Sequence, residues 1–93
     1  MAKISFLGDS ITKGTDYGGV TLADTFGFIV GTRLGYALSD IVNAGISANT
    51  TVAMAARFQT DVVARGVEVC GVMGMFNDIL QNISVADYSN ALR

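Results

Sequence analysis

The chain has 93 residues and a net charge of −2, with 51% hydrophobic and 15% charged residues. This composition is too apolar for a disordered protein, and the length suits one domain or a part of one. The six basic residues are scattered along the sequence, which argues against nucleic acid as a partner. No apolar run approaches the roughly 18 residues of a membrane span. The single cysteine, Cys70, excludes an internal disulfide, and there is no histidine to act as a general base.

The first predicted element is a strand over residues 3–7, where a short apolar run ends at Gly8. This run is shorter than the ~7–15 apolar residues of a signal peptide, so we expect no export signal and, by default, a cytoplasmic location. Residues 8–19 are rich in Gly, Ser, Thr and Asp, which predicts a loop.

A first helix is predicted over residues 20–36, where apolar residues recur every three or four positions. Its expected buried stripe consists of Leu22, Phe26, Ile29, Val30 and Leu34. Gly27, Gly31 and Gly35 lower the helix propensity by up to about 1 kcal/mol each. They also form a row of small residues, from which we expect the helix to lie close to the sheet.

A second strand is predicted over residues 40–44, and a second helix follows it. Thr50 or Thr51 is expected to cap this helix, which runs to about Arg65 and stops at Gly66. Its expected buried stripe consists of Met54, Phe58 and Val62.

A third strand is predicted over residues 67–73, which are apolar on both faces apart from Glu68. This pattern is typical of a buried parallel strand, within which Cys70 is expected to be a buried small residue. Ser84 and Asp87 have the spacing of a capping box and predict a third helix. The expected apolar face of that helix consists of Val85, Tyr88 and Leu92.

The predicted order is therefore β-α-β-α-β-α, which implies an α/β fold with a parallel sheet and right-handed crossovers. In such sheets the functional residues lie in the loops at the carboxyl ends of the strands. The candidate loops are residues 8–14, 43–51 and 74–78.

These loops contain Gly8-Asp9-Ser10, a glycine block from Asn43 to Thr50, and Asn77-Asp78. In this order and spacing they resemble three of the four signature blocks of the SGNH (GDSL-type) serine hydrolase family. The resemblance covers residues 1–93 as the N-terminal part of a single domain. It implies a flavodoxin-like, three-layer α/β/α fold with a parallel sheet.

A serine hydroxyl attacks an acyl carbon only if it can lose its proton and if the developing oxyanion is stabilised. The resemblance implies that Ser10 is the nucleophile. It also implies an oxyanion hole formed by the Ser10 N–H, the Gly45 N–H and the Asn77 side chain. Gly45 has no side chain to keep a ligand from its backbone. Asp9 and Asp78 are expected to brace their loops through hydrogen bonds.

The sequence departs from the family pattern at two positions. Met75 stands where the family usually has glycine, and its side chain is expected to narrow the pocket or to alter the loop that carries Asn77. Ala48 replaces the last glycine of the second block, which is a small change.

The missing histidine is a larger departure, because no catalytic triad can be completed within these residues. We expect the family's Asp-x-x-His block to lie beyond residue 93, and the third strand to present an unpaired apolar edge. The 93 residues are accordingly expected to be a fragment that hydrolyses little or nothing alone.

The main hypothesis is a serine hydrolase acting on carboxylic esters, with small-molecule or glycan ester substrates and without a cofactor or metal. Lipids, short acyl esters and acetylated sugars are substrate classes of the family, and nothing in the sequence selects among them. Two alternatives stay open: a flavodoxin-like module that binds phosphate or FMN through residues 10–15, and a non-catalytic domain on the same scaffold.

Overall fold

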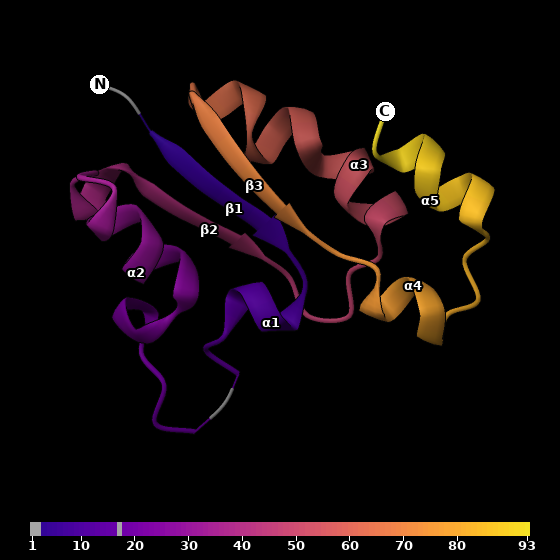
Figure 1. Ribbon diagram of the computed structural model, residues 1–93, viewed down its shortest axis with the longest axis horizontal. Coiled ribbons are helices and arrows are strands. Elements are labelled where there is room, and N and C mark those ends of the chain that lie inside the picture. Colours follow the sequence, from indigo (N-terminus) through magenta and orange to yellow (C-terminus); the bar gives the residue numbers. More distant parts are fainter. Residues whose placement is uncertain (1–2, 17) are drawn as a thin grey trace.

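Three parallel strands form one sheet in the order β2-β1-β3 in the computed structural model, which describes residues 3–16 and 18–93 (Figure 1). The strands are β1 (Ile4–Gly8), β2 (Ile41–Gly45) and β3 (Val69–Met73), each one residue or two shifted from its predicted start. Gly8 is in register with both Gly45 and Met73, so the three strands end side by side. The loops predicted to carry the site therefore all begin at the same end of the sheet, where the carboxyl ends of the strands lie.

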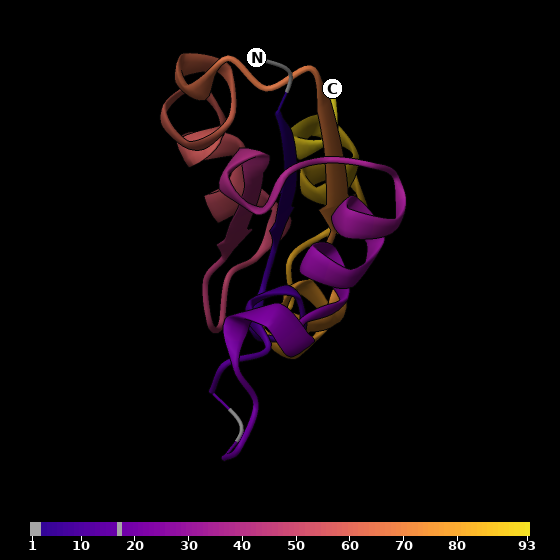
Figure 2. The same ribbon diagram turned by 90° about the vertical axis from the view of Figure 1, so that its left-hand side faces the viewer.

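The two faces of the central strand support two separate apolar clusters. Ile4 and Phe6 pack with Ile41 on one face, while Leu7 packs with Ala44 on the other. This alternation follows from the two-residue period of a strand, and all five residues of β1 are buried. The predicted α/β architecture with a parallel sheet is confirmed, and helices cover both faces (Figure 2).

One face is covered by α2 (Phe26–Arg33), which the 3₁₀ turn η1 (Leu22–Asp24) precedes. A Cβ added to Gly27 would lie 2.8 Å from the Phe6 ring, and one added to Gly31 would lie 2.8 Å from Ile41. The expected close approach of this helix to the sheet is therefore confirmed for these two glycines. Gly35, with φ +93°, follows the helix, and a Cβ added to it would meet no atom within 4 Å.

The apolar stripe predicted for this helix is wrong, as is its length of residues 20–36. The helix packs through its glycine side, so the bulky residues point outward and are 38–63% exposed: Leu22, Phe26, Ile29, Val30 and Leu34. The helix is short because Thr21 and Asp24 form a capping box around η1 and Thr25 is extended. A second 3₁₀ turn, η2 (Leu38–Asp40), leads into β2.

The other face is covered by α3 (Thr51–Asp61), which begins where the sequence predicts but ends before the predicted Arg65. Thr50 caps it by accepting a hydrogen bond from the Ala53 N–H at 3.2 Å. The chain then passes through η3 (Val63–Arg65) and turns at Gly66, whose φ is +69°. Met54 and Val62 are buried as expected, but Phe58 is 38% exposed.

Two short helices lie where only loops were predicted: α1 (Ser10–Lys13) and α4 (Phe76–Leu80). The last helix, α5 (Val85–Ala91), is capped by the Ser84 side chain and packs against α3. None of the helices in the described part of the chain is long and apolar enough to cross a membrane.

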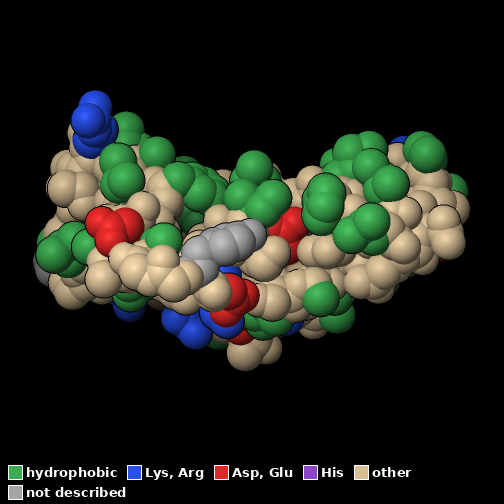
Figure 3. Space-filling model, turned by 90° about the horizontal axis from the view of Figure 1, so that it is seen from below, with side chains coloured by type: hydrophobic (Ala, Val, Ile, Leu, Met, Phe, Trp, Pro, Cys, Tyr) green, Lys and Arg blue, Asp and Glu red, His purple; other side chains and the backbone are tan. Residues whose placement is uncertain are grey.

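β3 is parallel as predicted, but it is one of the two outer strands of the sheet rather than a buried one. Val69, Val72 and Met73 are 45–49% exposed and Cys70 is half-buried, which corrects the expectation that these residues are buried. Within the described residues β3 pairs only with β1, so the expected unpaired apolar edge is confirmed there. Apolar side chains also gather over α4 and α5 (Figure 3), where four are 58–78% exposed: Phe76, Ile79, Leu80 and Val85.

Candidate active site

Ser10 lies at the first position of α1, directly after the central strand. The buried Asp9 caps this helix, because its Oδ1 accepts a hydrogen bond from the Ile11 N–H at 2.9 Å. The helix ends at Gly14, where φ is +69° and the N–H donates to the Ser10 carbonyl. Ser10 is partly exposed, and its own N–H donates to no other described residue. The serine thus lies at the carboxyl ends of the strands, and its N–H has no acceptor among residues 3–16 and 18–93.

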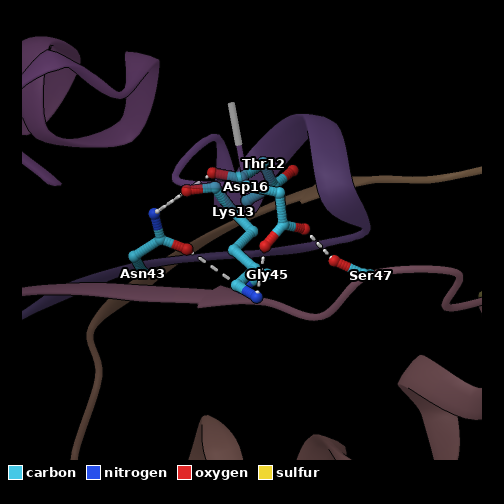
Figure 4. Close-up of polar contacts among 6 residues, drawn as sticks. All are labelled: Thr12, Lys13, Asp16, Asn43, Gly45 and Ser47. Atoms are coloured by element: carbon cyan, nitrogen blue, oxygen red, sulfur yellow. Dashed lines mark hydrogen bonds and ion pairs between the residues drawn. The ribbon is translucent and has the colours of Figure 1, made fainter. Parts of the chain in front are cut away.

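Asn43, in β2, fastens the second loop to α1 (Figure 4). Its Nδ2 donates to the carbonyls of Thr12 (3.1 Å) and Lys13 (3.2 Å), and its Oδ1 accepts from the Gly45 N–H at 3.0 Å. The last carbonyls of a helix have no hydrogen-bond donor within the helix, and Asn43 supplies such a donor to two of these carbonyls in α1. The sequence alone did not predict this role of Asn43, because an Asn two residues before a Gly is a common pattern that does not by itself indicate a contact with another loop.

Gly45 lies against α1 rather than facing open space. A Cβ at this position would collide with the backbone of Lys13 and would lie 2.9 Å from the Asp9 carbonyl. The glycine is thus needed for close packing of α1 on β2. The N–H predicted to hold an oxyanion is directed at Asn43.

A charged contact at the surface also joins the first and second loops. Lys13 Nζ lies 2.7 Å from Asp16 Oδ1, and the Ser47 hydroxyl donates to Asp16 Oδ2 (Figure 4). Lys13 chiefly, and then Ser47, hold the pKa of Asp16 below its ordinary value. The Asp16 carboxylate is therefore the group on which these two loops meet.

The third loop begins in a strained conformation. Met75, the N-cap of α4, has φ +99° and ψ −32°, a region that residues with a side chain rarely adopt. From the sequence, the side chain of Met75 is expected to alter this loop. The positive φ gives a separate physical reason why glycine suits this position. Ala48 in the second loop also has a positive φ, +65°.

Asn77 and Asp78 follow Met75 and are both buried. Asn77 Nδ2 donates to the Asn49 carbonyl at 3.1 Å. Asp78 Oδ1 accepts from the Thr51 N–H at 2.9 Å, and its Oδ2 accepts from the Thr51 hydroxyl. The third loop is thus joined to the start of α3.

The structure therefore brings the predicted residues to one edge of the sheet but does not turn all of them toward one point. Ser10 and Asn77 belong to adjacent strand ends, while Gly45 lies beneath α1. Arg57, which the sequence analysis did not assign to the site, reaches the carbonyl of Gly8 from α3 at 3.0 Å. No group of three or more His, Cys, Asp or Glu in residues 3–16 and 18–93 is placed to hold a metal ion.

No protein-family model matches the sequence, and no curated protein sequence matches it either. Solved structures do match. A G-D-S-L family lipolytic protein from Desulfitobacterium hafniense superposes with a TM-score of 0.83 at 21% identity, over 99% of this chain and 49% of its own.

Two further matches are more similar in sequence. AlinE4, an SGNH-hydrolase family esterase, matches at 25% identity and a TM-score of 0.76, over 99% of this chain and 50% of its own. The lipase/acylhydrolase from Enterococcus faecalis matches at 26% and 0.76, over 99% and 49%. The chain spans about half the length of the structures it matches. The resemblance found in the sequence is thereby confirmed, and the chain has the fold of SGNH (GDSL-type) hydrolases over about half of such a protein.

Proposed function

We propose that this chain supplies the nucleophile and the oxyanion donors of a serine hydrolase that cleaves carboxylic esters. The observation that carries the proposal is the position of Ser10, partly exposed at the start of α1 and at the carboxyl end of the central strand. Loops in α/β sheets bind substrates at this edge. The matched structures, which are esterases and lipases, support the same class of reaction.

In the proposed reaction the Ser10 Oγ attacks the ester carbonyl carbon while a general base takes the hydroxyl proton. The negative charge collects on the carbonyl oxygen, and preorganised N–H donors stabilise it. The intermediate collapses as the alcohol leaves with that proton, and water then hydrolyses the acyl-serine. The donors we assign in the described residues are the Ser10 N–H and the Asn77 side-chain amide, with one N–H from the second loop.

For the second-loop donor, the contacts favour Ala48 over the predicted Gly45. The Gly45 N–H would first have to leave Asn43 Oδ1, at 3.0 Å. The Ala48 N–H donates to no other described residue, and the Ala48 φ of +65° turns the backbone sharply at the tip of this loop. Replacing one amide by an ester at Gly45 or at Ala48 separates the two. Loss of the true donor should lower kcat by about 10²- to 10³-fold.

The base is proposed to be a histidine outside these 93 residues, in the part of the domain that the matched structures contain and this chain does not. Among the described residues, the two carboxylates beside the site are already engaged: Asp9 with the Ile11 N–H, and Asp78 with Thr51. Their proposed role is to brace the first and third loops. Residues 1–93 alone should therefore hydrolyse little or nothing, and the substrate is proposed to be a small-molecule or glycan ester.

The test uses the whole gene product that contains this chain, with a fluorophosphonate probe and p-nitrophenyl acetate. Ser10→Ala should abolish both labelling and turnover. Ser39→Ala is the matched control, because Ser39 is exposed in η2 and precedes β2, at the opposite edge of the sheet. Labelling that survives Ser10→Ala would remove the nucleophile assignment.

A further inference from the structure

Arg57 is a largely buried cation that projects from α3 toward the site. Its side chain is 14% exposed and makes three hydrogen bonds through three different nitrogens. A guanidinium holds its donors in one rigid plane, so each contact restricts the directions of the other two. Arg57 therefore fixes its three partners relative to one another.

The first partner is the backbone just before the nucleophile. Arg57 Nη2 donates to the Gly8 carbonyl at 3.0 Å, and the Ile46 N–H donates to the same oxygen at 3.0 Å. Because a peptide unit is planar, holding this carbonyl also sets the plane of the Asp9 N–H. Asp9 is the residue that caps α1 and precedes Ser10.

The second partner leads to the third loop. Arg57 Nε donates to Asn49 Oδ1 at 2.7 Å, while the Asn49 carbonyl accepts from Asn77 Nδ2 at 3.1 Å. Asn49 is thus held by its side chain and holds Asn77 by its main chain. The guanidinium reaches the first and second loops directly and the third loop through this residue.

The third partner keeps the guanidinium in place. Arg57 Nη1 lies 2.7 Å from Asp61 Oδ2, one turn later on α3, and the Asp61 side chain is 22% exposed. This pair lies on the helix and contacts none of the three loops. It leaves the other two nitrogens directed at Gly8 and Asn49.

We propose that Arg57 is a positioning residue, which sets the Ser10 turn and the Asn77 amide at the spacing that the oxyanion requires. The proposal rests on the proposed function, in which these groups act on one carbonyl oxygen. An ammonium on a flexible stem cannot reproduce three directed contacts. Arg57→Lys should therefore preserve the charge and lose the geometry.

The experiment compares Arg57→Lys with Arg65→Lys in the whole gene product. Arg65 is exposed in η3, so the control makes the same change away from the loops. With p-nitrophenyl acetate, Arg57→Lys should lower kcat about 10- to 100-fold with KM nearly unchanged, as expected when reacting groups are misplaced by about 1 Å. Guanidinium ion should restore part of the activity of Arg57→Ala.

A second measurement does not depend on catalysis. The NMR resonances of the Asn77 side-chain amide and the Ser10 backbone amide should shift in Arg57→Lys and stay in place in Arg65→Lys. If the wild type shows these resonances but no esterase activity, the proposed function fails while the positioning contact is still tested. Native kcat and unmoved resonances in Arg57→Lys would overturn the inference, as would a loss of activity that matches only the loss of folded protein.

Discussion

The strained backbone of Met75 makes a quantitative prediction about stability. A residue with a side chain at φ +99° and ψ −32° carries a conformational cost of order 1–3 kcal/mol. Met75→Gly removes that cost. It also loses the half of the Met75 side chain that is buried, about 1 kcal/mol, and adds about 0.5–1 kcal/mol of unfolded-state entropy. The net change in the free energy of unfolding should be close to zero or slightly stabilising.

Met75→Ala isolates the backbone contribution, because it loses the same side-chain contacts and keeps the strain. We expect the glycine variant to be more stable than the alanine variant by about 1–2 kcal/mol. At Ala56, exposed within α3, Ala→Gly should instead destabilise by about 1 kcal/mol. Urea unfolding of the three variants measures these differences. Equal stability of the two position-75 variants, or a more stable alanine, would refute the strain argument.

Two further predictions concern packing and pH. Gly45→Ala should lower the free energy of unfolding, measured in urea, by at least about 3 kcal/mol, because the new methyl group meets the backbone of Lys13. The control, Gly18→Ala, places its methyl group in open space and should be neutral or slightly stabilising. The pKa of Asp16 is lower in the folded chain than its ordinary value of 3.8. The contacts of the Asp16 carboxylate with Lys13 and Ser47 therefore stabilise the fold above pH 3.8, and this stabilisation is lost as the pH falls through the pKa of the folded chain. NMR titration of the Asp16 carboxyl should show its pKa rising in Lys13→Met and, by less, in Ser47→Ala; an unchanged pKa in both variants would show that these contacts do not form in solution.

The parts of the fold that the sequence predicts well are those set by local chemistry. Thr50 and Ser84 cap their helices with their own side chains, and Gly66 supplies the positive φ that ends the segment after α3. Each signal involves residues only a few positions apart. The order of strands and longer helices along the chain also follows from the alternation of short apolar runs and helical patterns.

The failures have a different origin. Bulky residues at helical spacing predict an apolar stripe on the first long helix. Gly27 and Gly31 instead allow a closer approach to the sheet than those residues would. The helices α1 and α4, at four and five residues, are too short to show a periodicity. Arg57 and Gly8 are 49 positions apart, so no local pattern connects them.

The contacts of the three loops explain why the site divides as it does. The side chains of Asp9, Asn43 and Asp78 form their hydrogen bonds with backbone and loop partners. That arrangement builds rigid supports for N–H donors, and rigidity is what an oxyanion site needs, because its donors must already point at the charge when it forms. The Asp9 and Asp78 carboxylates thus contact Ile11 and Thr51, and neither forms a hydrogen bond with Ser10 among the described residues. In the proposed reaction we therefore expect the base to be a residue that approaches Ser10 from outside these three loops.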